Sequence, residues 1–233
     1  MTARERVRAE ITREITDAAR THLAAQGAAA LSLRAVAREM GMVSSAIYRY
    51  FASRDDLLTA LIIDGYNAIG AAVETAEEAC GRDEYAGRWL ATCRAARAWA
   101  LGHPHEYALI YGSPVPGYQA PPDTVGPASR VAVIYGRIVS DAYDAGALRP
   151  PPCCPPVPAS LSEDAGRLRD AVMPGVPDGI AIRALTAWAG LFGQISFELF
   201  GQFNNVVDDK GALFDHAAGC LGGLVGLAVS VSA

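Results

Sequence analysis

The sequence predicts an all-α protein built from two parts. Apolar residues recur at helical spacing along most of the chain, which is typical of amphipathic helices. Helix-breaking prolines are absent before position 104, and twelve of the fourteen lie in residues 104–158. Residues 1–55 contain nine arginines and six acids (+3), whereas residues 56–233 contain eleven basic and nineteen acidic residues (−8). We therefore expect a basic domain of residues 1–54 and an acidic helical domain of residues 55–233.

Length and cysteine usage indicate a protein that folds without disulfides. A chain of 233 residues, 51% of them apolar, can bury a real core. No basic segment followed by an apolar stretch opens the chain, so we expect a cytoplasmic rather than a secreted protein. The cysteines are odd in number, and their spacing does not match a zinc pair. We interpret all five as reduced thiols: Cys80, Cys93, Cys153, Cys154 and Cys220.

The first helices are expected to include a helix-turn-helix over about residues 32–51. A first helix spans about Arg4 to Gln26 and ends at Gly27. Two shorter segments with helical apolar spacing then lie on either side of Gly41, joined by three or four residues. Glycine tolerates the left-handed backbone that such a tight joint needs. The bare pattern also fits any helical hairpin, but this one carries arginine, serine and tyrosine on its outer face.

Serines mark where the next helices begin. Ser32 is placed to cap the second helix and Ser44 the third. Ser53 and Asp56 form a capping box for a fourth helix that extends to about Ala79.

Four further helices and a proline-rich loop are expected in the middle of the chain. Pro104 suits the first turn of a helix, and residues 148–158 hold too many prolines for one. His103, His105 and Glu106 do not form a metal site, because residues two apart do not share a helix face. The other expected helices are residues 84–102, 127–146 and 160–172.

The last two helices have two apolar faces each, so they need two partners. From Ala181, large residues recur at Leu185, Trp188, Phe192, Ile195 and Leu199, while small residues recur on another face. The final helix, about residues 213–229, repeats this pattern with glycines. A paired membrane helix over residues 217–233 is the rival interpretation, but that stretch is shorter than a span. We expect a homodimer whose interface includes Ala189, Gly193, Phe197, Gly219, Gly222 and Gly226.

The helix-turn-helix stretch resembles the tetracycline-repressor (TetR) family of bacterial regulators. The residues that carry the resemblance are Ala37, Gly41, Tyr48, Tyr50, Phe51, Ser53, Arg54, Leu57 and Leu58. Val43 departs from the family pattern, which usually has a small polar residue at the start of the recognition helix. The resemblance implies a three-helix DNA-binding domain whose second motif helix enters the major groove. The residues it implies for DNA contact are Ser32, Arg34, Ser44, Ser45, Ala46, Tyr48, Arg49, Tyr50 and Arg54, of which Ser32 and Arg54 are expected to hold phosphate.

A second resemblance concerns the rest of the chain. The segment from Trp99 to Tyr118 and residues 197–203 are similar to the C-terminal domain of the WHG-type subgroup of TetR regulators. The naming tripeptide reads Trp188-Ala189-Gly190 here, without its central histidine. The family fold would bring together an apolar set with a few hydroxyl, thiol and indole groups, which suits a small-molecule pocket or simply fills a core. This set is Trp89, Cys93, Trp99, Tyr107, Tyr111, Phe192, Ile195 and Ser196.

These features favour a homodimeric transcriptional regulator, a repressor released from operator DNA by an uncharged apolar or aromatic effector. The alternative is a helical small-molecule-binding protein with no role on DNA. Four scattered histidines, with no glycine-rich phosphate loop and no Ser-His-Asp arrangement, give no indication of an enzyme, a cofactor or a metal.

Overall fold

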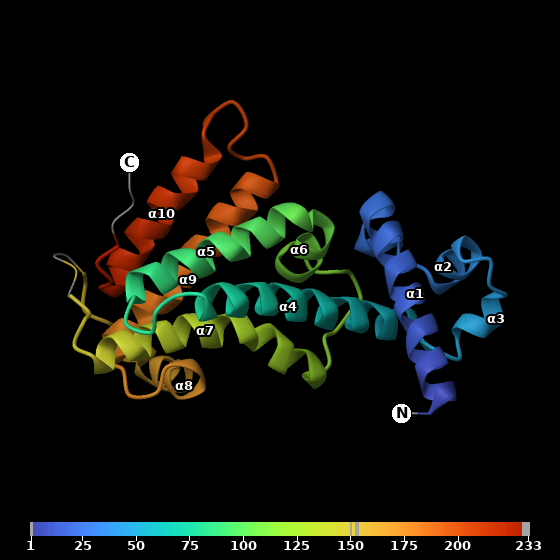
Figure 1. The fold of residues 1–233 in the computed structure, drawn as a ribbon, viewed down its shortest axis with the longest axis horizontal. Helices are drawn as coiled ribbons and strands as arrows, with labels where there is room; N and C mark the ends of the chain where they lie inside the picture. The colour runs from blue at the N-terminus through green and yellow to red at the C-terminus, as the bar shows by residue number, and fades with distance from the viewer. Residues whose placement is uncertain (1, 150, 152–153, 230–233) are drawn as a thin grey trace. The chain divides into compact units, whose positions relative to one another are not determined.

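A computed structural model describes residues 2–149, 151 and 154–229, and every regular element within them is a helix. The predicted all-α class is therefore confirmed (Figure 1). The α-helices are α1 (Ala3–Gln26), α2 (Leu33–Glu39), α3 (Ser44–Ile47), α4 (Arg54–Glu78), α5 (Tyr85–Gly102), α6 (Pro104–Tyr111), α7 (Val125–Asp144), α8 (Ser162–Val172), α9 (Asp178–Leu199) and α10 (Lys210–Val225). Short 3₁₀ helices cover Ala28–Ala30, Pro122–Thr124 and Ala159–Leu161.

The chain forms two compact units, each drawn from two stretches of sequence. The first unit contains residues 1–67 and 103–127, and the second contains residues 68–102 and 128–233. Helix α4 contributes residues to both. The predicted domains, in contrast, are each continuous in sequence.

Three of the predicted helix starts can be compared with the observed caps. The capping box of α4 is present, since the Ser53 and Asp56 side chains each accept the other's backbone N–H at 3.1 and 3.0 Å. Ser32 occupies the cap position of α2, but its side chain makes no capping hydrogen bond. The prediction for Ser44 is wrong. Val43 takes the extended cap conformation, and Ser44 is already the first helical residue.

The last helix is shifted from its predicted bounds. Helix α10 begins at Lys210, because the Asp209 carboxylate caps it by accepting the Ala212 N–H at 2.8 Å. It ends at Val225, because Gly226 adopts a left-handed backbone with φ of 109°. Sequence periodicity missed the start because residues 210–212 carry little apolar signal.

The predicted large face of α9 is partly wrong. Leu185 is exposed and Trp188 is half-buried, whereas small residues take much of the buried face. Neighbouring helices pack close to α9 through its buried alanines. The face with the largest side chains is therefore not the most buried face of the helix. The buried residues of α9 are Ala181, Ala184, Ala187, Leu191, Phe192 and Ile195.

The core of the first unit holds the helix-turn-helix in place. Ile15 of α1, Val36 of α2 and Ile47 of α3 are each fully buried in one apolar cluster with α4. Burying such a side chain contributes about 1.5–3 kcal/mol. Polar contacts add to this: the Arg20 guanidinium on α1 pairs with Asp64 at 2.7 Å and with Glu106 of α6 at 3.1 Å.

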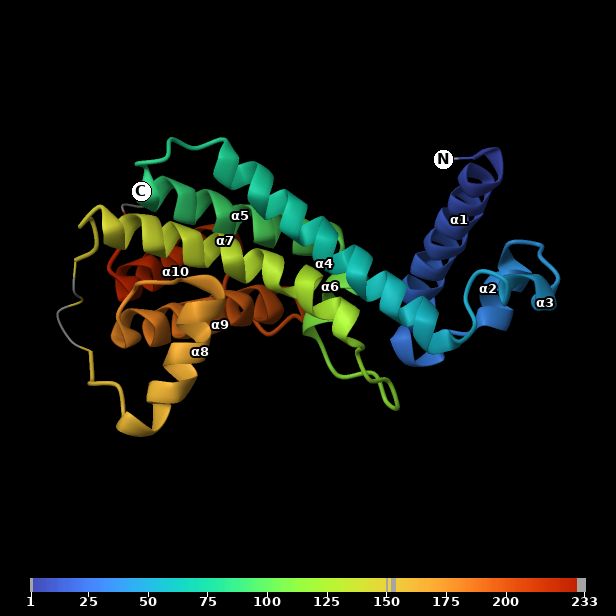
Figure 2. The same cartoon turned by 90° about the horizontal axis from the view of Figure 1, so that it is seen from below.

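Helix α5 is the centre of the second unit, where it contacts α9 and α10 (Figure 1). The buried Trp89 indole donates to the Ala218 carbonyl of α10 at 2.9 Å. Two bidentate ion pairs lie beside it, from Arg94 to Asp215 of α10 and from Arg97 to Glu198 of α9. Helices α9 and α10 pack side by side, and α8 lies against α9 (Figure 2).

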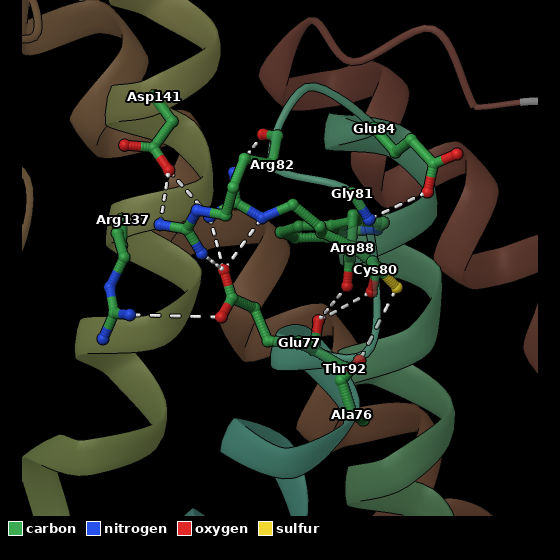
Figure 3. A network of polar contacts seen from close by, with 11 residues as sticks. Ala76, Glu77, Cys80, Gly81, Arg82, Glu84, Arg88, Thr92, Arg137 and Asp141 are labelled. Atoms are coloured by element: carbon green, nitrogen blue, oxygen red, sulfur yellow. Dashed lines mark hydrogen bonds and ion pairs between the residues drawn. The ribbon is translucent and has the colours of Figure 1, made fainter.

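A buried ion pair joins α5 to the end of α4 and to α7 (Figure 3). The side chains of Arg88 and Glu77 are both 0% exposed, and the Arg88 Nε donates to Glu77 Oε1 at 2.8 Å. Arg88 also donates to Asp141 at 2.7 Å and to the Arg82 carbonyl at 2.9 Å. Burial alone lowers the pKa of Arg88, but the hydrogen bonds to Asp141 and Glu77 outweigh it and raise the pKa above its usual value. Arg88 therefore stays charged inside the unit.

By length and composition alone, α4 and α9 are apolar enough to cross a membrane. Of their most apolar windows, 44% and 39% are buried inside the protein, and one or two helices of this kind are weak evidence for a membrane span. Helix α10, at 16 residues, is shorter than the roughly 20 residues that a span needs. Residues 230–233 of the stretch considered above for a membrane helix lie outside the described part of the chain.

The ion pair leads to a stability prediction. Replacing Arg88 with Met leaves the buried Glu77 carboxylate with only Arg82 and Arg137 as partners, and their side chains are 63% and 43% exposed. The loss of its one fully buried partner should lower the free energy of unfolding by about 3 kcal/mol. The double variant Arg88→Met/Glu77→Leu should recover most of that loss, because the uncompensated charge is gone. Chemical denaturation measures both.

Arg167→Ala is the matched control, because it breaks an exposed pair with Asp164 and should cost at most about 1 kcal/mol. An Arg88→Met variant no less stable than this control would contradict the role given to the buried pair.

Candidate nucleic-acid interface and regulatory pocket

The turn between α2 and α3 depends on Gly41. Its φ of 66° lies in the left-handed region, as its place in the sequence predicts. The Gly41 N–H donates to the Arg38 carbonyl at 3.1 Å, and the Met42 N–H donates to the Ala37 carbonyl at 2.8 Å. These two bonds end α2 and direct the chain into α3, which fixes the angle between the two motif helices.

Helix α3 presents a polar face to solvent while one residue anchors it. Ile47 is 0% exposed in the core, whereas Ser44, Ser45 and Arg49 are exposed. Tyr48 is 46% exposed, and Ala46 and Tyr50 are half-buried. Val43, which the sequence analysis treated only as a departure from the family pattern, is 73% exposed beside this face.

Two arginines at this face are free to bind a ligand. Arg34 on α2 and Arg49 after α3 are both exposed, and in the described part of the chain neither has an acidic partner. A free guanidinium can take two acceptors at once, as the edge of guanine or a phosphate offers.

Arg8 supports α3 from α1, a role that the sequence did not indicate. Its guanidinium donates to the Arg49 carbonyl at 2.9 Å and lies over the Tyr50 ring, 5.4 Å from the centroid. No sequence signal joins residues 41 positions apart. Arg8 therefore positions Tyr50 and the end of α3 instead of being only solvated.

Arg54 is held by the protein itself, although it was expected to contact phosphate. Its Nε donates to the Leu31 carbonyl at 3.0 Å, and its Nη2 donates to the Ala28 carbonyl at 3.0 Å. These carbonyls lie in the connection between α1 and α2, and Asp55 is a further partner at 3.5 Å. The geometry gives Arg54 a structural role, because its donors are directed inward. Ser32, its predicted companion, is half-buried at the start of α2.

The second unit contains an apolar pocket of about 140 Å³. Its walls come from α5, α7, α8 and α9, and Gly136 on α7 is one of the lining residues. A Cβ at Gly136 would stand 2.1 Å from the Val172 carbonyl oxygen, so only glycine lets α7 and α8 approach this closely. The lining side chains include Trp89, Tyr135, Val139, Leu185 and Trp188. Such a volume suits a group about the size of benzene.

The residues predicted to bind an effector are divided between the two units. Trp89 lines the pocket, and Cys93, Trp99, Phe192, Ile195 and Ser196 belong to the same unit. Burial raises the pKa of Cys93 to about 12, so its thiol is unreactive. Tyr107 and Tyr111 belong to the first unit, where their ring centroids are 5.2 Å apart. Most of the actual lining, such as Val139 and Leu168, could not be found by periodicity alone.

The residues predicted for the dimer interface differ in their exposure. Ala189, Gly193 and Phe197 are exposed, and Gly219 is half-buried. Gly222 and Gly226 are buried. A Cβ at Gly222 would meet Val229 at 2.6 Å and Trp89 at 3.0 Å, and one at Gly226 would meet the Arg149 carbonyl oxygen at 2.6 Å. These two glycines allow close packing within the chain.

Comparisons with known proteins cover nearly the whole chain. Residues 15–61 match the profile of the family described as bacterial regulatory proteins, tetR family, and residues 89–221 match that of the tetracyclin repressor-like C-terminal domain. HTH-type transcriptional regulators of Mycobacterium tuberculosis and Mycobacterium bovis are 40% identical over 215 residues, which is 91% of this chain and 91% of each relative.

Solved structures show the same fold. The crystal structure of a regulatory protein, SCO4313, is 35% identical, with a TM-score of 0.78 over 95% of this chain and 100% of that one. A tetR-family regulator from Shewanella sp. PV-4 has a TM-score of 0.59 at 15% identity, covering 95% of this chain and 98% of its own, and supports the fold alone.

Proposed function

Because the chain belongs to the TetR family and is a DNA-binding transcriptional regulator, we propose that it is a dimeric repressor that an uncharged apolar effector releases from operator DNA. The observation that carries this proposal is the exposed face of α3, flanked by the unpaired guanidinium groups of Arg34 and Arg49. Operator DNA lies in the cytoplasm of a bacterium, which is where we expect the protein to act.

The proposed DNA contacts follow from the chemistry of this face. Arg34 and Arg49 take the acceptors of guanine or phosphate, while Ser44, Ser45 and Tyr48 offer hydroxyl groups to base edges or phosphates. Val43 and Ala46 supply apolar contacts of the kind that suit a thymine methyl group. We assign Arg54 and Arg8 to positioning, because their guanidinium groups already bind backbone carbonyls.

The proposed effector enters the second unit, where the apolar pocket supports it. Trp89 lines that pocket, and its neighbour Arg88 binds Glu77 near the end of α4. A ligand that displaces Trp89 would therefore move α4, the helix that continues into the first unit. Such a ligand binds one conformation better than the other, which is the differential affinity that allosteric release requires. The pocket's apolar walls favour an aromatic or aliphatic group without charge.

We also propose that this second unit is of the WHG type. The Trp188-Ala189-Gly190 tripeptide supports this assignment, with Trp188 lining the pocket and Ala189 exposed on the predicted dimer face. The earlier set of Cys93, Trp99, Tyr107, Tyr111, Phe192, Ile195 and Ser196 remains a prediction for residues that respond to the effector.

DNA binding is tested with Arg34→Ala and Arg49→Ala. Each should weaken binding to the promoter region of the protein's own gene by about 1–3 kcal/mol, because a bidentate contact is lost. Gel-shift titration measures the affinity. Arg167→Ala, which removes the same charge from the second unit, should leave it unchanged. If Arg34→Ala and Arg49→Ala both keep the helical fold and bind the operator with wild-type affinity, the assignment is refuted.

Dimerisation is tested with Gly193→Arg. A Cβ at Gly193 meets no atom within 4 Å, so the chain can accept the side chain while a partner cannot. Light scattering should report monomers, and tight operator binding should be lost because a dimer reads two half-sites about 34–36 Å apart. Gly126→Arg, at another open position, should remain dimeric. An intact Gly193→Arg dimer would place the interface elsewhere.

The pocket is tested by filling it. Ala132→Leu should occupy part of the 140 Å³ and abolish thermal stabilisation by small aromatic compounds, without changing operator affinity. In the wild-type protein, a compound at 100 times its Kd should stabilise the fold by about 2.7 kcal/mol. Ala128→Leu, on α7 outside the pocket lining, is the control. Equal stabilisation of both variants by the same compound would remove this pocket as the effector site.

A further inference from the structure

Helix α10 carries a thiol and an imidazole one turn apart on its outer surface. The Cys220 Sγ lies 3.6 Å from the His216 Nε2, and both residues are exposed. Residues four apart share a helix face, so the two groups point in the same direction. Neither takes part in the apolar pocket or in the face of α3.

The separation of these two atoms is that of two ligands on one metal ion. Zinc binds thiolate sulfur at about 2.3 Å and imidazole nitrogen at about 2.05 Å, and a tetrahedral angle between them gives a separation of about 3.6 Å. The two atoms are therefore as far apart as two ligands of one zinc ion, and in this structure a hydrogen bond joins them. On binding, the thiol loses its proton to solvent and the thiolate becomes the ligand.

One chain supplies only half of such a site. In the residues that the structure describes, no group of three or more His, Cys, Asp or Glu side chains is placed to hold a metal. Structural zinc takes four ligands, commonly two cysteines and two histidines. The missing pair has the composition that a second copy of α10 would bring.

The surface around the pair suits a second α10. Ala212 and Gly223 are exposed on the same side of the helix, and a Cβ at Gly223 would meet no atom within 4 Å. The one carboxylate within α10, Asp215, is already paired with Arg94. The small residues on this side, together with an Asp215 carboxylate that is already paired, let another helix backbone come near.

We propose that two copies of the chain share a zinc-type metal site, formed by His216 and Cys220 of each. This inference rests on the dimer of the proposed function and goes beyond it, since neither DNA reading nor the effector pocket needs a metal. It also gives Cys220 a role beyond that of the reduced thiol predicted from the sequence. A borderline-soft divalent cation such as Zn²⁺ or Co²⁺ is the expected ligand.

Cobalt titration of the full-length dimer tests the proposal. Co²⁺ should give the absorption of a tetrahedral ion together with a thiolate-to-cobalt charge-transfer band, saturating at one ion for two chains. His216→Ala and Cys220→Ser should each weaken binding by more than about 100-fold, because losing a direct ligand exceeds the 10–100-fold cost of losing a supporting residue. His105→Ala and Cys154→Ser, away from α10, should bind as the wild type does.

Light scattering of the metal-free protein separates this inference from the proposed dimer. A metal-free dimer that gives no tetrahedral cobalt spectrum, or one that saturates at one ion per chain, overturns the shared site and leaves the dimer standing. A metal-free monomer contradicts the dimer of the proposed function. In that case, cobalt that pairs the chains at one ion for two supports the shared site, and cobalt that leaves them monomeric overturns it.

Discussion

The buried pair of Arg88 and Glu77 is the constraint on which the second unit depends. Separating two opposite charges that are both fully buried leaves each of them in the interior without its best partner. The pair therefore fixes the position of α5 against the end of α4, and Asp141 adds α7 to the same joint. Arg94 and Arg97 attach α10 and α9 to the other turns of α5. Helix α5 thus supports both the pocket wall at Trp89 and the two helices proposed for dimerisation, α9 and α10.

The first unit, which contains the helix-turn-helix, and the second unit are stabilised in different ways. The first unit buries Ile15, Val36 and Ile47, and this core holds a short helix whose polar side chains stay exposed. Isolated helices of this length are unstable in water, so the order of α3 comes from its neighbours. In the second unit, ion pairs between helices, one of them fully buried, hold long helices together while an apolar pocket remains between them. The first arrangement suits a surface that binds DNA, and the second suits an interior that can adapt to a ligand.

Sequence periodicity predicted the elements that have strong local signals. Gly41, the capping box of Ser53 and Asp56, and Pro104 at the start of α6 each act within a few residues of where they stand. The features that the sequence did not indicate concern long-range partners. Arg54 was expected on phosphate because its carbonyl acceptors, some 25 residues away, cannot be seen in a sequence. Gly222 was expected at an interface because a small residue lets a second chain pack closely. A small residue serves packing within one chain equally well, and here Gly222 packs against Trp89. The pocket lining was likewise missed, since it depends on how four helices meet.

The composition of the first unit has a consequence for how the protein is made. Leu109, Val115 and Tyr118 pack against the core of α1–α4, and the Tyr118 hydroxyl lies 2.9 Å from that of Thr59. These residues are synthesised 42 to 51 positions after Asn67, at which the first stretch of the unit ends. At about 5–20 residues per second, the ribosome needs roughly 2–10 s to deliver them. During that interval the first unit is incomplete, and the apolar surface that these residues will cover is exposed. The first unit therefore cannot finish folding before residues 68–102 of the second unit have been translated.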